Sequence, residues 1–376
     1  MNVLVVTNEY PPEKTAGTAM ATSFLAEELA SRGVGVTVVV NTRAAAPARE
    51  TVAGVQVVRL RPLPVPATRM AQRAAMILRV ARRVRPHIVQ GQSLSCGALA
   101  AFVGRALRIP SVTYVQGLDL YQASAWARRT YIRWALRHSH GVAAVTEDLR
   151  RRALQIADRP VAVIPHGLRP HDTHRLGRAE ARRSLGLPEE RPVVLYVGRL
   201  LRIKGVGHLV RAFPQILESC PSALLVLVGD GDERDALQRL ARELGTAGQV
   251  VFAGLQPHEQ VITFMRASDV LVLPSLVESF GIVLVEAMSC GLPVVASRVM
   301  GIPYVVEDGV NGFLVPPGDE TALADRVVRL LSDPELREAF RARNVRKAAE
   351  YAISRVADRF LELWEALAGI PRGEAA

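Results

Sequence analysis

The chain has 376 residues, of which 49% are hydrophobic and 22% charged, and its formal net charge at pH 7 is +11. This length allows two domains with substantial cores, and no apolar run approaches the roughly 20 residues that span a bilayer. The three scattered cysteines lack metal-ligand spacing, and the first residues lack a basic region followed by a cleavable apolar stretch. We therefore expect a globular protein of a reducing cytosol, without a signal peptide.

Strand-like apolar runs alternate with helix-like segments along the chain. Those of the first half are Val3–Val6, Gly35–Val40, Val55–Leu60, His87–Val89, Ser111–Val115, Gly141–Val145 and Val161–Ile164. Those of the second half are Val193–Val197, Ala223–Val228, Val250–Ala253, Val270–Leu273 and Pro293–Ala296. Continuous apolar strands between helices indicate parallel sheets covered on both faces. They are too many for one ordinary doubly wound sheet, so the pattern predicts two Rossmann-like α/β domains, with a linker near Pro165–Gly177.

The positive charge is concentrated in the first half of the chain. Residues 1–170 carry 23 basic and 9 acidic side chains, a net charge of +14, whereas residues 171–376 carry 24 and 27, a net charge of −3. The first half should therefore attract an anionic partner: a phosphorylated acceptor, an anionic lipid surface or nucleic acid.

Residues 69–85 predict an amphipathic helix. Met70, Ala74, Ile77, Leu78, Ala81 and Val84 fall on one arc, and Arg69, Arg73, Arg79 and Arg83 on the other. The favoured interpretation is a helix packed on the sheet with a solvated basic face. The second is peripheral contact with an anionic membrane, at the inner membrane face of the cell. The segment Trp126–Arg137, with two tryptophans, a tyrosine and four arginines, adds modest support to the second.

A glycine and two cations follow the predicted strand that ends at Val197. The residues are Gly198, Arg199 and Lys204, with the cations five residues apart. Fixed cations beside a helix terminus can stabilise a departing diphosphate without a metal ion.

Two glutamates lie eight residues apart after the predicted strand Val270–Leu273. Glu278 precedes the start of a predicted helix, and Glu286 lies two turns along it. A helix N-terminus offers unpaired N–H groups and partial positive charge to a phosphate, and open α/β sheets bind ligands at the carboxyl ends of their strands. A diphosphate carrying a sugar at one end and a ribose at the other fits this layout. The apolar neighbours of Glu286 predict that it is partly buried.

These motifs together carry a family resemblance. The segment Pro274–Ser297 (PSLVESFGIVLVEAMSCGLPVVAS) resembles the E-x7-E signature of retaining GT-B-fold glycosyltransferases, glycosyltransferase family 4 (glycosyl transferases group 1). Residues 198–205 are similar to the family pattern GR-L-x-x-x-K-G, and weaker matches run from about Asn2 to Asp319. The resemblance implies two Rossmann-like domains facing across a cleft, whose closure excludes water.

The resemblance assigns a role to each domain. It implies an acceptor-binding domain over residues 1–167, onto which a final helix, 353–368, packs back. It implies a nucleotide-sugar-binding domain over residues 168–352. The reaction implied is transfer of a hexosyl unit, with retention of configuration, from a UDP- or GDP-linked sugar to an acceptor hydroxyl. The acceptor would be phosphorylated, lipid-linked or a saccharide.

The resemblance also assigns site residues. Arg199 and Lys204 would stabilise the leaving diphosphate, Glu278 would contact the donor sugar and Glu286 the ribose hydroxyls. Backbone N–H groups of Phe280, Gly281, Ile282 and Val283 would hold the phosphates, and the loop at Leu255 would pair with the base. No cofactor beyond the donor substrate and no metal ion is implied.

Two positions in the first half depart from the family pattern. The family has a glycine pair near the first helix, where this chain has Ala16 and Gly17, so one glycine is kept for contact with the donor. A histidine that usually touches the donor sugar is Gln116 here. Glutamine can hydrogen-bond a hydroxyl, but it cannot carry charge or shuttle a proton.

Other functions are less well supported. Eight residues along one helix span roughly 12 Å, more than the about 5–9.5 Å between glycosidase carboxylates, so a glycosidase is disfavoured if both glutamates lie on the helix. A GT-B-fold sugar-nucleotide epimerase and a non-catalytic nucleotide binder remain as alternatives, while nucleic-acid binding lacks interleaved aromatic and basic strand residues. We interpret Asp232 as a helix N-cap and not, with Asp230, as a metal site. The histidines at 138, 140, 166, 171 and 174 are expected to be exposed or capping residues.

Overall fold

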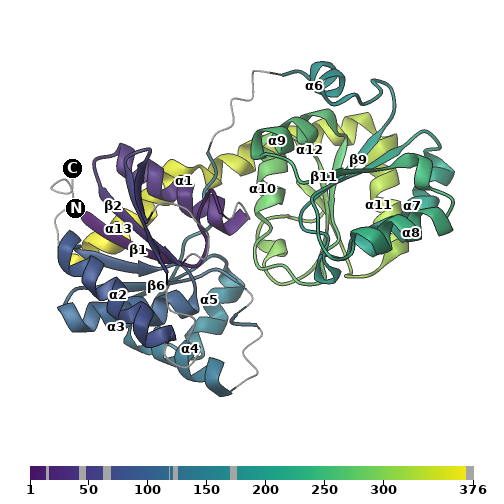
Figure 1. Cartoon of the computed structure of the whole chain (residues 1–376). Coiled ribbons are helices and arrows are strands. Elements are labelled where there is room, and N and C mark those ends of the chain that lie inside the picture. Colours follow the sequence, from purple (N-terminus) through teal and green to yellow (C-terminus); the bar gives the residue numbers. More distant parts are fainter. Residues whose placement is uncertain are drawn as a thin grey trace. The chain divides into compact units, whose positions relative to one another are not determined.

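The computed structural model describes residues 1–13, 17–41, 48–61, 69–117, 119–121, 126–169 and 176–369. The chain divides into two compact units (Figure 1). Unit 1 comprises Met1–Arg169 and Tyr351–Ala376, and unit 2 comprises Pro170–Glu350. Part of the predicted linker, residues 170–175, lies outside the described residues.

Unit 1 is built on an eight-stranded sheet in the order β3-β4-β2-β1-β5-β6-β7-β8. The strands are β1 Asn2–Thr7, β2 Gly35–Asn41, β3 Arg49–Val52, β4 Val55–Leu60, β5 Ile88–Gly91, β6 Ser111–Val115, β7 Gly141–Ala144 and β8 Val161–Val163. All neighbouring pairs are parallel except β3 with β4. The edge strand β3 is absent from the sequence prediction because its RETV segment has no apolar run.

The helices of unit 1 come from both ends of the chain. They are α1 Gly17–Ser31, α2 Arg69–Val84, α3 Leu94–Leu107, α4 Trp126–His138, α5 Glu147–Leu154 and α13 Ile353–Ala368. Helix α13 contacts α1 (Figure 1). Arg32 Nη1 lies 2.6 Å from Asp358 Oδ1, and Trp364 Nε1 donates to Gln90 Oε1 at 2.8 Å. The buried indole thus satisfies its N–H on the central strand β5.

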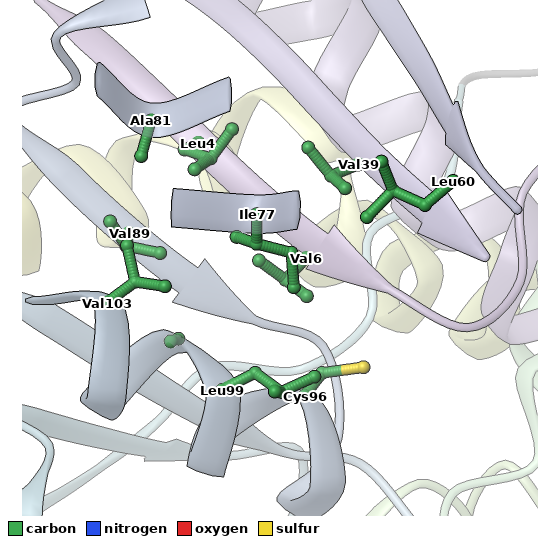
Figure 2. Close-up of a cluster of buried hydrophobic side chains, with 11 residues drawn as sticks. Leu4, Val6, Val39, Leu60, Ile77, Ala81, Val89, Cys96, Leu99 and Val103 are labelled. Atoms are coloured by element: carbon green, nitrogen blue, oxygen red, sulfur yellow. The ribbon is translucent and has the colours of Figure 1, made fainter. Parts of the chain in front are cut away.

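A buried apolar cluster joins one face of this sheet to two helices (Figure 2). Its members are Leu4, Val6, Val39, Leu60 and Val89 from the strands, Ile77 and Ala81 from α2, and Cys96, Leu99, Ala100 and Val103 from α3. The strand side chains that face α2 and α3 recur at every second residue along β1, as the alternation of a pleated strand requires.

Helix α2 confirms the favoured interpretation of a sheet-packed helix but not every assigned position. Ile77 and Ala81 are buried, and Arg79, Arg82 and Arg83 are exposed. Two expected positions are wrong: Met70 is 43% exposed, and Arg73 is buried. Arg73 Nη2 donates to Asn8 Oδ1 at 2.8 Å, which provides the polar partner that a buried guanidinium needs.

Unit 2 is a six-stranded parallel sheet in the order β11-β10-β9-β12-β13-β14. The strands are β9 Val193–Val197, β10 Leu224–Val228, β11 Val250–Gly254, β12 Val270–Leu273, β13 Val294–Ser297 and β14 Gly312–Val315. The helices are α6 Arg178–Leu185, α7 Val206–Ser219, α8 Arg234–Glu243, α9 His258–Ala267, α10 Ile282–Ser289, α11 Glu320–Ser332 and α12 Pro334–Ala348. Strand β14 is absent from the sequence prediction.

The strand order of unit 2 reverses between β9 and β12. Strands β10 and β11 follow β9 on one side of the sheet, whereas β13 and β14 follow β12 on the other side. The crevice outside the carboxyl ends of two such strands is where open α/β sheets bind their ligands. The expectation of two Rossmann-like α/β domains is confirmed, and this switch point directs attention to the residues after Val197 and Leu273.

Candidate active site

The loops after β9 and β12 are fastened to each other at the switch point. The β9 loop contains a single turn of 3-10 helix, Arg202–Lys204. The backbone N–H groups of Leu276 and Val277 donate to the carbonyl of Ile203 at 2.9 and 3.3 Å. The two sequence motifs, 74 residues apart, therefore form one site.

Lys204 and Glu278 form an ion pair. Lys204 Nζ lies 2.7 Å from Glu278 Oε2, and the side chains are 19% and 14% exposed. At this burial the pair is poorly screened by solvent, and the loss of either partner would leave the other charge uncompensated. The sequence motifs indicated both residues but not the contact between them.

The pair is held in place by close packing of backbone at Gly205. This residue has φ +66°, a left-handed conformation that favours glycine, and a Cβ atom there would lie 2.0 Å from the Pro274 carbonyl oxygen. Helix α7 begins at the next residue. Only glycine lets the β9 loop approach β12 this closely beside Lys204.

We expect Gly205→Ala to lower the free energy of unfolding by about 2 kcal/mol or more, because both the backbone conformation and the contact with Pro274 must change. Activity should fall as well, because Lys204 is the preceding residue. Urea unfolding and sugar-transfer assays measure the two effects. Gly207→Ala is the control, since the nearest atom to its Cβ would be Arg211 Nη1, at 3.4 Å; equal effects of the two substitutions would contradict this account.

Helix α10 begins with an uncapped amino terminus near this pair. Its N-cap residue, Gly281, has φ +79°, and within the described residues no side chain caps the first amide groups. Glu278 lies four residues before the helix and Glu286 within it. The predicted helix start is confirmed, and the N–H groups of Ile282 and Val283 belong to its first turn. Phe280 lies before the helix, and its side chain is buried.

The position of Glu278 corrects one step of the sequence argument. The separation of roughly 12 Å supposed that both glutamates lie on one helix. Because Glu278 lies in the loop and is held by Lys204, that estimate does not apply. What disfavours a glycosidase is the pairing itself, since a carboxylate fixed to an ammonium group is not a free acid or base.

Glu286 is buried, as predicted. It is 8% exposed, and burial raises the pKa of its carboxyl group from 4.5 to about 7. His258 Nδ1 lies 3.8 Å from Glu286 Oε1, which is too far for a hydrogen bond. Burial also lowers the pKa of His258, so near pH 7 the imidazole adds little positive charge beside Glu286. A carboxyl group poised to titrate near neutrality is typical of a ligand-binding position.

The remaining candidates of unit 2 follow β9 and β11. The Gly198 N–H donates to the Val228 carbonyl at 3.0 Å. The hydroxyl group of the buried Tyr196 donates to the backbone carbonyl of Arg199 at 2.9 Å, and the Arg199 side chain is exposed. Leu255 follows the edge strand β11 and is 77% exposed, an unusual position for a large apolar side chain. The hydrogen bond from Gly229 N–H to the Gly254 carbonyl, at 2.8 Å, ties the β11 end to the end of β10.

In unit 1 the candidate Gln116 is buried, and its side chain forms a hydrogen bond. It follows β6, and its Nε2 donates to Oε1 of Gln92, which follows the neighbouring strand β5. These two glutamines line a cavity of about 10 Å³, with room for about one water molecule. Gln92 was missed because its role depends on the adjacency of β5 and β6. Gly17 is the first residue of α1 and is exposed.

Two minor expectations are wrong. His166 is buried beside Tyr114, and burial lowers its pKa to about 3. Asp232 is not an N-cap, because α8 begins at Arg234 with Glu233 in the cap position. His171 and His174 lie outside the described residues. Within the described ranges no group of three histidine, cysteine or acidic side chains has the arrangement of a metal site.

The fold is similar to that of known glycosyltransferases. Sucrose-phosphate synthase from Thermosynechococcus elongatus aligns with a TM-score of 0.86 and 25% identity, over 99% of this chain and 100% of that one. Anabaena HepE, in a crystal structure with UDP, aligns with a TM-score of 0.82 and 22% identity, over 98% and 100%. Two parallel-sheet units with this switch point define a protein of the GT-B class.

The sequence comparisons give the family. The model described as "Glycosyl transferases group 1" matches residues 177–347, and that described as "Glycosyltransferase Family 4" matches residues 16–172. An uncharacterized glycosyltransferase of Methanocaldococcus jannaschii is 33% identical over 90% of this chain and 91% of its own length. The alpha-D-kanosaminyltransferase of Streptomyces kanamyceticus is 32% identical over 77% and 80%. The chain belongs to this family and is a glycosyltransferase of the GT-B type.

In the part of the chain that the structure describes, no helix is both long enough and apolar enough to cross a bilayer.

Proposed function

We propose that the enzyme transfers a hexosyl unit from a UDP- or GDP-linked sugar to an acceptor hydroxyl, with retention of anomeric configuration and without a metal ion. The observation that carries this proposal is the Lys204–Glu278 pair at the switch point of unit 2, followed by the uncapped N-terminus of α10. A fixed cation and helix amide groups are what a leaving diphosphate requires.

Each partner of the ion pair has a task in this proposal. The diphosphate competes with Glu278 for the ammonium group of Lys204, and Arg199 supplies a second, exposed cation. The Glu278 carboxylate then accepts hydrogen bonds from hydroxyl groups of the donor sugar, because ionised carboxylates are acceptors only. Backbone N–H groups from Phe280 to Val283 hold the phosphate oxygens.

The nucleoside end of the donor would extend along α10 and towards β11. Glu286 lies on the second turn of α10 and would accept hydrogen bonds from the ribose hydroxyls. The exposed Leu255 would cover one face of the base, which would bury its apolar surface. HepE was crystallised with UDP, which supports a nucleotide-linked donor for this fold.

Charge supports a proposal for the acceptor. The first half of the chain, which forms most of unit 1, has a net charge of +14 and suits a phosphorylated or lipid-linked acceptor better than a neutral one. The D-inositol 3-phosphate glycosyltransferase of Acidothermus cellulolyticus is 41% identical over 51% of this chain and 44% of its own length. Its name gives it a phosphorylated acceptor. We propose that unit 1 binds the acceptor through its basic residues, and that Gln116 and Gly17 contact the donor from the same unit.

The reaction needs no carboxylate nucleophile in this proposal. The acceptor hydroxyl attacks the anomeric carbon on the face that the diphosphate leaves. The new C–O bond forms as the bond to the diphosphate breaks, and the departing phosphate oxygen takes the hydroxyl proton. Glu278 forms no bond to the anomeric carbon in this proposal, because its carboxylate accepts hydrogen bonds from the hydroxyl groups of the donor sugar.

The test is a panel of UDP-, GDP- and ADP-linked sugars, incubated with candidate acceptors in the presence of EDTA. We expect nucleoside diphosphate release from a UDP- or GDP-linked donor, an acceptor-dependent increase in that release, and NMR signals of a product with the anomeric configuration of the donor. Inverted product would contradict retention, and loss of activity in EDTA would contradict metal independence. Isomerised donor without transfer would favour the epimerase.

A membrane contact by unit 1 would be electrostatic. The apolar side of α2 is used in the core, so the helix cannot insert it into lipid. The exposed Arg79, Arg82 and Arg83 remain for an anionic surface. We expect the triple alanine variant to lose most of its binding to vesicles that contain phosphatidylglycerol, at about 1 kcal/mol per arginine. Unchanged cosedimentation of the variant would contradict the contact.

A further inference from the structure

Unit 2 has a second cleft, on the opposite edge of its sheet from the proposed donor site. Its volume is about 640 Å³, and it includes Asp269 and Pro293, the residues directly before β12 and β13. Because these strands are parallel, their amino ends lie on the edge opposite to Glu278 and the start of α10. The described walls come from residues in or next to α6, α9, α10 and α12.

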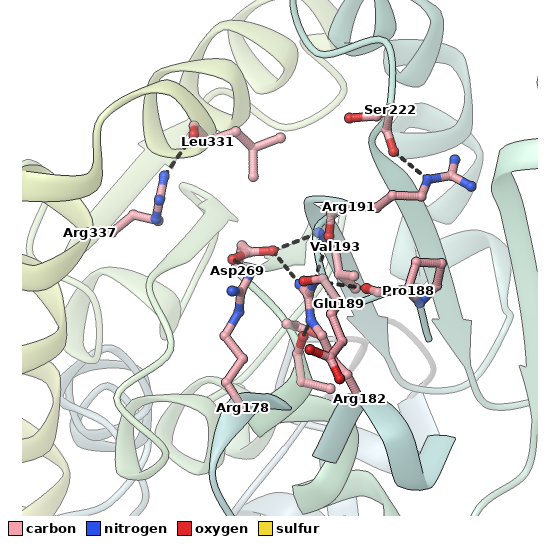
Figure 3. A network of polar contacts seen from close by, with 12 residues as sticks. Arg178, Arg182, Pro188, Glu189, Arg191, Val193, Ser222, Asp269, Leu331 and Arg337 are labelled. Atoms are coloured by element: carbon pink, nitrogen blue, oxygen red, sulfur yellow. Dashed lines mark hydrogen bonds and ion pairs between the residues drawn. The ribbon is translucent and has the colours of Figure 1, made fainter. Parts of the chain in front are cut away.

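Among the residues that the structure describes, four arginines line this cleft, which we call the arginine cleft. They are Arg178, Arg266, Arg337 and Arg341, and the acidic residues of the described lining are Asp269 and Glu338. Asp269 is already engaged: it lies 2.6 Å from Arg178 and 2.8 Å from the buried Arg182, and accepts the Val193 N–H at 2.7 Å (Figure 3). The described lining has four arginines and two acidic residues, and Arg182, which is outside the lining, shares Asp269 with Arg178, so the cleft carries an excess of positive charge.

The two arginines of α12 are held one turn apart on the same side of the helix. Like charges at this spacing repel each other by about 0.2–0.5 kcal/mol. Arg337 Nη1 donates to the carbonyl oxygens of Leu330 and Leu331 at 2.6 and 2.7 Å, which fixes its guanidinium group at the end of α11 (Figure 3). Both bonds use Nη1, so Nε and Nη2 can still donate to a ligand.

Arg341 packs against the end of α10. A Cβ atom at Gly291, the residue after the α10 C-cap, would lie 2.8 Å from Arg341 Cγ. The stem of Arg341 therefore crosses Gly291 closely while its side chain stays exposed. Arginines with partly fixed stems lose less side-chain entropy when they bind an oxyanion, and their planar forks match phosphate oxygens.

The cleft also has an apolar part. Met265, Leu292 and Val345 contribute to its lining, and Val345 is 49% exposed one turn after Arg341. The volume falls within the roughly 300–1,000 Å³ typical of small-molecule sites. A ligand that satisfies both parts has a phosphate group and an organic portion of metabolite size.

We propose that the arginine cleft binds a small organic phosphate at a site separate from the donor site. The phosphate oxygens lie between Arg337 and Arg341 of α12, with Arg178 and Arg266 as the surrounding positive charge. The organic portion lies against Val345 and Leu292.

The experiment is calorimetric titration of the full chain with pyrophosphate at constant ionic strength. Lys204→Ala is made in every protein, to weaken binding of the probe at the proposed donor site. In this background we expect measurable pyrophosphate binding, weakened at least tenfold by Arg341→Glu. Arg346→Glu, a charge reversal of an exposed arginine on the same helix but outside the cleft, should change the dissociation constant less than twofold.

Two outcomes would overturn the proposal. One is the absence of pyrophosphate binding in the Lys204→Ala protein. The other is equal weakening by Arg341→Glu and Arg346→Glu, which would indicate only a diffuse charge effect. Melting curves establish that the variants are folded, and Val345→Asp gives a second test of the cleft, because it should weaken binding without removing an arginine. Binding here and catalysis at Lys204 can fail separately, so this inference does not depend on the proposed function.

Discussion

Replacing Lys204 with alanine is expected to lower kcat/KM for sugar transfer by about 10²–10³-fold, the range seen when one preorganised electrostatic group is removed from a site of developing charge. Lys204 is the cation held at the switch point, 2.7 Å from Glu278, and it is only 19% exposed. Water cannot replace an ammonium group fixed before the reaction begins. The measurement is nucleoside diphosphate release with the donor and acceptor that the panel identifies.

Two controls separate charge from stability. Arg202→Ala removes an exposed cation two residues earlier in the same turn and should leave kcat/KM within about threefold of the wild type. Lys204→Ala also leaves Glu278 without its partner, so the double variant Lys204→Ala/Glu278→Gln tests whether lost stability causes lost activity. If the double variant regains both stability and transfer, Lys204 has only a structural role.

The second large effect is a pH-dependent stabilisation by Glu286→Gln. Burial raises the pKa of Glu286 to about 7 in the folded protein, so between pH 4.5 and 7 the folded protein holds a proton that the unfolded chain releases. The stability due to this proton is fully present below pH 4.5 and is lost as pH rises through 7. Glutamine does not titrate, so the variant should gain up to about 3 kcal/mol over the wild type between pH 4.5 and 8.

Urea unfolding at pH 5 and pH 8 measures this difference. Glu259→Gln, an exposed position at the start of α9, is the matched control and should show no such change between the two pH values. If Glu286 binds the ribose hydroxyls, donor affinity of the wild type should also rise with pH near 7, because the carboxylate is the better acceptor. A pH-independent stability difference would contradict the raised pKa.

Local sequence patterns predicted the elements of the fold but not their neighbours. The apolar runs located β9 and β12, and glycine at 281 agreed with a helix that begins at Ile282. The ion pair between Lys204 and Glu278 depends on β9 and β12 being adjacent, which no local pattern encodes. The bond between Gln92 and Gln116 was missed for the same reason, since it depends on β5 lying beside β6.

The sequence patterns also did not predict which polar side chains are buried by segments that are distant in the sequence. His166 lies in a Pro-His-Gly stretch that is typical of a loop, but the same small cavity brings it together with Tyr114 and with Phe360 of the returning helix α13. Arg73 lies on the expected basic face of α2, but Asn8, after β1, gives it a buried partner. In both cases tertiary contacts override a pattern that is local in sequence.

The most direct test of the account is a crystal structure of the enzyme with the nucleoside diphosphate that the donor panel selects. We predict phosphate oxygens within hydrogen-bond distance of the N–H groups of Ile282 and Val283 and of Lys204 Nζ, with the ribose hydroxyls at Glu286. A diphosphate bound elsewhere, with Lys204 still paired to Glu278 and the α10 amide groups solvated, would contradict the proposed donor site.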